Sequence, residues 1–388
     1  MNSSLVVRLY SVHSLLSKLF FFLPIIVIWF RDQGFSQFQV TLIMSSFFLS
    51  ATVAEIPSGI FSDKYGYRWA LFITGILEAI GMVLIANADH FITALIGEVL
   101  NGIGYAFYTG SKESYLFHFL TITREDGTYQ KRFARAKLFE FIGMAAGGLV
   151  GGSIYIYWKE LPFYLSAISF VASSLLIFYL PTVRQGASDS ISSLNHLRQG
   201  IEHIRTGDQD LKTLLAFYCA YLSSMLIFLV TLNQPYLRES GIPLSYFGLV
   251  FLGFHLCSMG GSEVARHLPG EQLTRRLFFF IGLGLASGIM VLGFFRSPFS
   301  ILLIFGIHFL WGLFFPVTSQ ATNRLIDSRW RGTVLAAQDF VQNLLFVILA
   351  PLLGWITDER GLSTALWLLG AFAGLTLLFS LKMRLGRK

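Results

Sequence analysis

Charged residues are scarce in this chain of 388 residues, where they make up 13% of the sequence, against about 25% in an ordinary soluble domain. Hydrophobic residues make up 54%, and the mean hydropathy is +0.63. A chain this apolar would aggregate in water, so we expect its solvent to be lipid. Cysteine is also rare: Cys219 and Cys257 both fall within apolar runs, where packing is a better expectation than a disulfide bond.

Several enzyme motifs are missing. The chain has no Gly-x-x-x-x-Gly-Lys-Ser/Thr loop, so we do not expect ATP to drive it directly. It has no His-Glu-x-x-His pair and no Cys-x-x-Cys. We therefore expect no catalytic activity, no cofactor and no metal site. A membrane enzyme would need acids or histidines clustered at one membrane face, whereas the acids here are dispersed. A channel would need a repeated pore element, usually supplied by an oligomer.

Long apolar runs predict membrane-spanning helices, because unpaired backbone amides are not tolerated in hydrocarbon. Strands of a membrane barrel would alternate apolar and polar residues over about 10 positions, while the runs here are continuous and longer. We expect an all-α integral membrane protein with twelve spans, covering roughly 9–30, 38–61, 68–88, 91–117, 134–157, 161–180, 211–236, 244–265, 274–295, 298–322, 332–356 and 363–383.

Basic residues are distributed unevenly between the two ends of these spans. The chain has 29 lysines and arginines, of which Lys18 and Lys112 fall inside spans. Only five lie on the side opposite the N-terminus: Arg31, Lys159, Arg238, Arg296 and Arg360. Because basic loops stay in the cytoplasm, we expect a multi-pass protein of the plasma (inner) membrane with both termini cytoplasmic. This distribution also argues against nucleic acid as the reason for the net charge of +7.

One long polar stretch divides the spans into six and six. We expect an N-terminal six-helix bundle over 1–181, a cytoplasmic linker over 182–210 and a C-terminal six-helix bundle over 211–388. Within the linker, apolar residues recur at helical spacing, which predicts an amphipathic helix on the membrane surface; they are Ile191, Leu194, Leu197, Ile201 and Ile204.

The two halves of the sequence echo each other. The run Arg31-Asp32-Gln33-Gly34 matches Arg238-Glu239-Ser240-Gly241 at an offset of 207 residues. A second echo links Gly59-x-x-x-Asp63-x-x-Gly66 to Gly354-x-x-x-Asp358-x-x-Gly361, at a helix end expected on the other side of the membrane. Internal repeats of this kind are typical of secondary transporters.

The segment 59–68 is a short charged turn between two apolar runs. It resembles the loop signature of the major facilitator superfamily, Gly-x-x-x-Asp-Arg/Lys-x-Gly-Arg-Arg/Lys, with Tyr67 in place of one basic residue. The resemblance implies a monomeric transporter of two six-helix bundles that carries a small molecule by alternating access. It also implies that the carboxylate of Asp63, placed just past a helix end, contacts the start of helix 11 at 329–333. The implied gate residues are Gly59, Asp63, Lys64, Gly66 and Arg68.

Two further stretches resemble bacterial drug and metabolite efflux members of the superfamily. Glu98-x-x-Asn101-Gly102-x-Gly104 is similar to their Arg-x-x-Gln-Gly-x-Gly, with an acid in place of the arginine. The run Gly143-x-x-x-Gly147-Gly148-x-x-Gly151-Gly152 is similar to an antiporter signature that has proline where Gly148 stands; its small residues also predict close helix packing. We expect proton-coupled efflux of a small organic compound. Proton-coupled uptake or facilitated transport of a metabolite is the alternative.

Ionisable and polar residues inside spans are the candidates for the cavity and for proton coupling, because such residues are costly in lipid. Lys18 is expected to meet an acid or an anionic substrate group. Glu55 shares a helix face with Asp63, burial would favour its protonated form, and we expect Glu55 and Lys18 to bias each other's charge. The full set of candidates is Lys18, Glu55, Glu98, Asn101, Tyr105, Glu140, Asp339 and Asn343.

Overall fold

The structure, a computed structural model, describes residues 3–183, 209–268, 275–326 and 330–383. Eleven helices in these ranges are long and apolar enough to cross a membrane. The all-α membrane architecture expected from the sequence is confirmed, and the twelve-span arrangement agrees with it once the interrupted first helix is counted. The residues expected to form the amphipathic linker helix, 191–204, lie outside the described residues.

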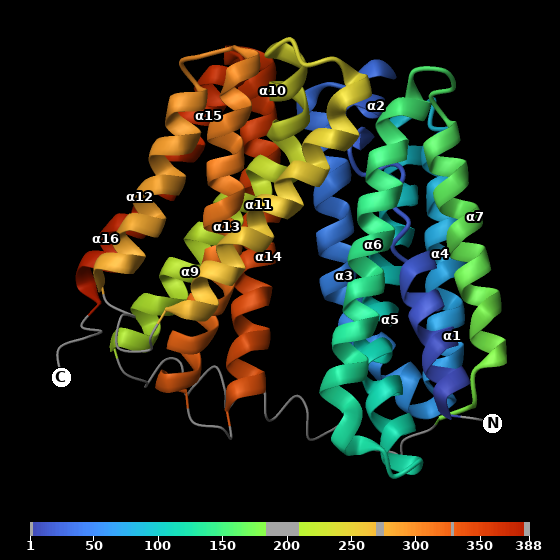
Figure 1. Ribbon diagram of the computed structural model, residues 1–388. Coiled ribbons are helices and arrows are strands. Elements are labelled where there is room, and N and C mark those ends of the chain that lie inside the picture. Colours follow the sequence, from blue (N-terminus) through green and yellow to red (C-terminus); the bar gives the residue numbers. More distant parts are fainter. Residues whose placement is uncertain (1–2, 184–208, 269–274, 327–329, 384–388) are drawn as a thin grey trace. The chain divides into compact units, whose positions relative to one another are not determined.

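The described residues form two units, each with its own internal packing, and the first comprises 3–34, 43–183 and 244–251. In it, α4 packs on α5 and α7, while α1 packs on α6 and α7 (Figure 1). Its helices are α1 (Ser3–Leu16), α2 (Ile26–Asp32), α3 (Gln37–Tyr65), α4 (Tyr67–Ala86), α5 (Phe91–Ile122), α6 (Tyr129–Tyr155) and α7 (Leu161–Leu176), with short 3-10 turns η1 (Asp126–Thr128) and η2 (Ile177–Tyr179).

The second unit comprises 35–42, 209–243 and 252–383 within the described residues, so it includes the first turns of α3. In it, α9 packs on α14 and α16, and α12 packs on α13, α15 and α16. Its helices are α9 (Gln209–Ile227), α10 (Asn233–Glu239), α11 (Phe247–His267, whose start belongs to the first unit), α12 (Arg275–Leu292), α13 (Ile301–Leu325), α14 (Arg331–Arg360), α15 (Leu362–Ala373) and α16 (Leu375–Lys382). The short turns are η3 (Phe228–Leu232), η4 (Leu244–Tyr246) and η6 (Pro298–Ser300).

The first span departs from the sequence expectation. A continuous helix over 9–30 was expected, but the chain leaves the helix after Leu16 and re-enters it at Ile26. Pro24 lies within this break; it has no N–H to donate and it disfavours helical geometry in the residue before it. Non-helical backbone is tolerated at membrane depth only where protein or a water-filled cavity surrounds it. We call residues 17–25 the break.

The corresponding helix of the second half is also irregular. Adding the repeat offset of 207 to 21 and 25 gives 228 and 232, which are the bounds of η3, a π-helical turn over Phe228–Leu232. The helix ends match as well, since Gly34 and Gly241 have φ of 88° and 78°. Gly66 and Gly361, from the second echo, have φ/ψ of 91°/152° and 84°/162°. The echoes seen in the sequence therefore share backbone geometry.

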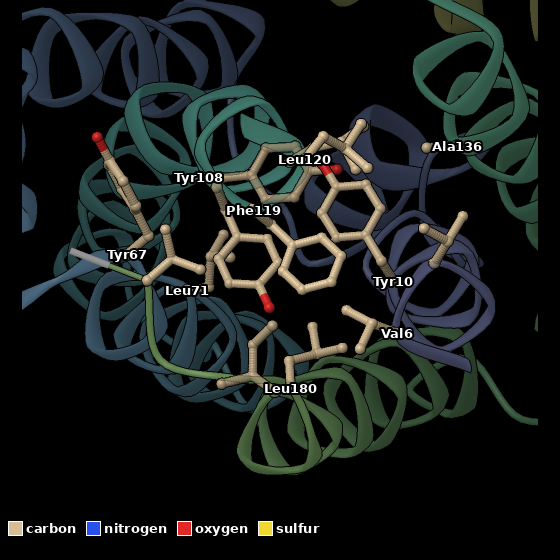
Figure 2. Close-up of a cluster of buried hydrophobic side chains, with 14 residues drawn as sticks. Val6, Tyr10, Tyr67, Leu71, Tyr108, Phe119, Leu120, Ala136 and Leu180 are labelled. Carbon is tan, nitrogen blue, oxygen red and sulfur yellow. The ribbon is translucent and has the colours of Figure 1, made fainter. Parts of the chain in front are cut away.

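A core of aromatic and aliphatic side chains from α1, α4, α5 and the residues around η2 lies within the first unit (Figure 2). Tyr10 of α1 stacks on Tyr115 of α5, with ring centroids 5.9 Å apart. The Tyr10 hydroxyl donates a hydrogen bond of 2.8 Å to the carbonyl of Lys112. Tyr108 belongs to the same core, and its hydroxyl reaches the charged groups described next, so this packing fixes the position of one wall of the site.

Candidate functional site

Glycines of α6 make room for the break. A Cβ atom added at Gly143 would lie 2.4 Å from the carbonyl oxygen of Leu15, and one at Gly151 would lie 1.8 Å from that of Phe21. At Gly147 it would lie 2.8 Å from the amide nitrogen of Phe20. Any larger residue would displace backbone, so the glycine stripe provides the close packing that the sequence predicted. The surface it contacts is the break.

Serines of α7 satisfy backbone groups that the break leaves without helical partners. The Phe21 amide donates to Ser166 Oγ at 3.1 Å, and Ser169 Oγ donates to the Leu16 carbonyl at 2.7 Å. An unpaired backbone group in a lipid-facing position costs several kcal/mol. The break is therefore held by α6 on one side and by α7 on the other.

Lys18 lies in the break, and its side chain is 8% exposed. Its ammonium faces three aromatic rings, with the nitrogen 4.2 Å from the centroid of Tyr108, 4.9 Å from that of Phe20 and 5.4 Å from that of Tyr105. Within the described residues no carboxylate lies within ion-pair distance of it and no acceptor forms a hydrogen bond with it. Cation–π contacts compensate part of its desolvation.

Glu140 of α6 is fully engaged. It forms an ion pair with the buried Lys112 of α5, accepts a hydrogen bond of 2.8 Å from the Tyr108 hydroxyl, and has Lys137 Nζ at 3.5 Å. Tyr108 is also 3.3 Å from Ser17 Oγ, in the break. The sequence singled out Glu140 but left its partners open, and the structure identifies them as Lys112, Tyr108 and Lys137.

Glu78 of α4 is the carboxylate whose charge acts on Lys18, and this residue was not among the sequence candidates. It is 7% exposed, and within the described residues it accepts no hydrogen bond and forms no ion pair. The signal was available, since an acid near the middle of the span expected over 68–88 is a functional candidate by position alone. Lys18 and Glu78 are thus opposite charges, buried in one unit and not in contact.

The remaining candidates occupy different places. Tyr105 is part of the aromatic wall around Lys18 and remains 38% exposed. Glu98 and Asn101, one turn apart on α5, are buried. Glu55 is exposed on α3, and the structure gives it no interaction with Lys18. Asp339 is exposed and Asn343 is half-buried on α14, in the second unit.

The gate residues lie where α3 meets α4, and the turn between the two helices is shorter than expected. Asp63 and Lys64 are in the last turn of α3 and not past its end, because only Gly66 leaves helical geometry. Its φ of 91° requires glycine. Arg68 donates to Thr182 Oγ1 at 3.2 Å and to the Phe178 carbonyl. Gly59 has open space around it, since an added Cβ would meet nothing within 4 Å.

The expected contact of Asp63 with 329–333 stays a prediction, because Arg329 lies outside the described residues and the two ends belong to different units. Among the described residues, no group of three or more His, Cys, Asp or Glu side chains could hold a metal ion. Cys219 and Cys257 are both free.

Comparisons with known proteins agree with this architecture. The family model described as Major Facilitator Superfamily matches residues 11–349. An uncharacterized MFS-type transporter of Methanocaldococcus jannaschii is 27% identical over 159 residues, which cover 41% of this chain and 40% of that protein. The probable galactarate/D-glucarate transporter of Bacillus subtilis is 30% identical over 142 residues, covering 33% of this chain and 30% of that one. The chain thus spans less than half the length of the curated relatives it matches.

Among solved structures, the nucleoside transporter NupG matches with a TM-score of 0.83 at 12% sequence identity, covering 99% of each chain. A mutant of NupG matches with a TM-score of 0.84 at 14% identity, covering 98% of this chain and all of that one. At such low identity, the match concerns the fold alone.

Proposed function

Because this chain belongs to the major facilitator superfamily of membrane transporters, we propose that it carries a small organic compound across the plasma membrane in exchange for, or together with, protons. The observation that supports this most directly is the pair of buried opposite charges, Lys18 and Glu78, beside the break in the first helix. Transport, a membrane setting and the lack of an enzymatic role come with the family. Proton coupling, direction and the choice of membrane are our proposals.

The break is the proposed substrate site. Irregular segments at corresponding places in two repeats point to a transporter's binding site, because helices broken at mid-membrane expose backbone groups and polar side chains to a cavity. Here the break and η3 are such a pair. Tyr105, which is 38% exposed and whose ring faces the ammonium of Lys18, marks the side from which we propose that a ligand reaches this site.

Glu78 is the proposed proton acceptor. A carboxyl group changes protonation in response to nearby charge and to the loss of water around it. Glu140 is held by Lys112, Tyr108 and Lys137, so its protonation would break several contacts at once. Glu78 has no such contacts, and the charged and titratable groups around it are Lys18 from the break and Tyr108 from α5.

The arrangement of charges favours uptake. A proton on Glu78 removes the negative charge that acts on Lys18 and leaves the site more positive. A positive site attracts oxygen-rich or negatively charged groups, so proton and substrate would bind together, and an inward proton gradient would then drive accumulation. Export, which the sequence favours, requires that proton and substrate exclude each other. The glycine stripe of α6 supports neither direction in particular, since three of its glycines make room for the break.

The test is transport by the purified protein in proteoliposomes with imposed pH gradients, over a panel that includes D-glucarate and uridine. We expect at least one compound to accumulate inside when the lumen is made alkaline, and adding that compound without a gradient should move protons in the same direction. Proton movement opposite to the substrate would show export by antiport. Transport that ignores the pH gradient would overturn proton coupling.

We also propose that both termini are cytoplasmic, on the basis of the uneven distribution of lysine and arginine. A cysteine placed at Gln33 should react with an impermeant maleimide added outside intact cells, and one at Tyr65 should react only after the membrane is opened. A background without Cys219 and Cys257 is needed. The reverse pattern would invert the topology.

A further inference from the structure

Lys18 has donors without acceptors. An ammonium carries three N–H donors and no acceptor. Within the described residues none of the three finds an oxygen, although the side chain is only 8% exposed. The three aromatic faces attract the charge, but they do not replace hydrogen bonds to oxygen. The nitrogen is not among the unpartnered atoms that protein encloses completely, so an acceptor from outside the protein can reach it, and a hydrogen bond to that acceptor would recover part of the desolvation cost.

The protein's own carboxylates do not fill this role. Glu140 lies nearby through Tyr108, yet its oxygens are taken by Lys112, the Tyr108 hydroxyl and Lys137. Glu78 acts on Lys18 through space and does not touch it. The Tyr108 hydroxyl donates to Glu140, and the Ser17 hydroxyl, 3.3 Å from that of Tyr108, donates to the Ser14 carbonyl. Within the described residues, Lys18 is therefore the cation beside the break that is open to a ligand.

We propose that Lys18 binds an anionic oxygen group of the substrate, a carboxylate or a phosphate ester, so that the transported compound is an organic anion. The aromatic rings of Phe20, Tyr105 and Tyr108 would hold the carbon skeleton next to that group. This inference rests on the proposed transport function and narrows it to a substrate class. Charge-assisted hydrogen bonds to an ammonium are roughly twice as strong as neutral ones, so the charged group would contribute much of the affinity.

The geometry also gives Lys18 two alternative counterions. With the site empty, the negative charge of Glu78 acts on Lys18 from a distance, against the positive charges of Lys137 and Lys112. With an organic anion bound, Lys18 would be neutralised by direct contact, and the negative charge of Glu78 would repel the ligand. Protonation of Glu78 removes that repulsion. Binding of the anion and of the proton would therefore reinforce each other, which is a coupling free energy between two sites.

Matched pairs of acids and neutral analogues test the substrate class: benzoate with benzamide, succinate with succinamide, and glycerol 3-phosphate with glycerol. Binding is measured by thermal stabilisation of the purified protein and by competition with a bound acid. We expect at least one acid to bind and its neutral partner to bind about 10- to 100-fold more weakly. The pair whose acid binds more tightly than its neutral analogue shows whether the site prefers a carboxylate or a phosphate. If the neutral analogues bind as well as the acids, or if no acid binds, the proposal is wrong.

Lys18→Met should abolish the preference for the acid, and Lys18→Arg should retain part of it because the charge stays. Lys131→Met is the matched control, since Lys131 is exposed on α6; it should leave the preference unchanged. Acid binding that Lys18→Met leaves intact would contradict the assignment to this residue. If acid binding needs Lys18 but transport does not respond to the pH gradient, this inference stands and proton coupling is overturned. If protons drive the transport of a neutral compound, proton coupling stands and the anionic substrate class is overturned.

Discussion

The close packing of the break against α6 leads to a specific prediction for one glycine, Gly151. In Gly151→Ala the new methyl group would lie 1.8 Å from the Phe21 carbonyl oxygen and 2.7 Å from its carbon, where ordinary contacts lie at 3.4–4 Å. These atoms are backbone, so no side chain can rotate away and the break itself must move. Overpacking of this kind costs about 1–3 kcal/mol, and the severity of the overlap places this case at the upper end.

An opposing effect must be subtracted. Alanine is favoured over glycine in a helix by about 1 kcal/mol, so the net loss for Gly151→Ala is about 2 kcal/mol. In units of 150–250 residues each kcal/mol lowers the melting temperature by about 2–4 °C, which gives a fall of about 4–8 °C. Gly148→Ala, on the same helix, is the matched control because its Cβ would meet nothing within 4 Å; it should leave the melting temperature unchanged or raise it.

The assay is the thermal unfolding of both purified variants in one detergent, followed by substrate exchange in proteoliposomes. Gly151→Ala should lose exchange even below its melting temperature, because the break carries Lys18. Equal melting temperatures and equal exchange for the two variants would refute the claim that α6 positions the break.

Three other substitutions test separate contacts. Lys112→Met removes the buried cation beside Glu140, which keeps Tyr108 and Lys137, and should lower stability by about 1–3 kcal/mol, as read from thermal unfolding; no loss would mean that the ion pair does not form. The Asp358 carboxylate accepts hydrogen bonds of 2.8 Å from the backbone amides of Gln37 and Phe38 and so caps the start of α3. Asp358→Asn should therefore speed amide hydrogen exchange there, and unchanged exchange would argue against this cap. Asp63→Asn should slow turnover and spare substrate affinity; near-normal transport would remove Asp63 from the gate.

The architecture was readable from the sequence because its signals are local. Continuous apolar runs predict helices, and the glycines at the repeated positions need a positive φ, so Gly66 and Gly361 mark helix junctions in both halves. The break was not predicted. Residues 17–25 are as apolar as a helix, and Pro24 alone is common in membrane helices; what holds the break open is packing against α6 and hydrogen bonds from α7, which are distant in sequence.

The site was predicted in part, for a similar reason. The sequence identified Lys18, Tyr105 and Glu140 because polar residues inside spans are costly in lipid and are therefore functional candidates. Their partners depend on how the helices pack. Glu55 was expected to act on Lys18 because both lie at similar depth. The charge that acts on Lys18 belongs to Glu78, while Glu55 is exposed on α3, and sequence periodicity within one helix cannot distinguish the two.

Proton coupling depends most on Glu78, the residue that we propose carries the proton. The measurement that tests it most directly compares gradient-driven accumulation with exchange between equal substrate pools, in the Glu78→Gln and Glu55→Gln variants. Exchange requires no net proton movement, so Glu78→Gln should retain exchange and lose accumulation, while Glu55→Gln should retain both. Full proton-driven accumulation by Glu78→Gln, or its loss in Glu55→Gln alone, would contradict the account.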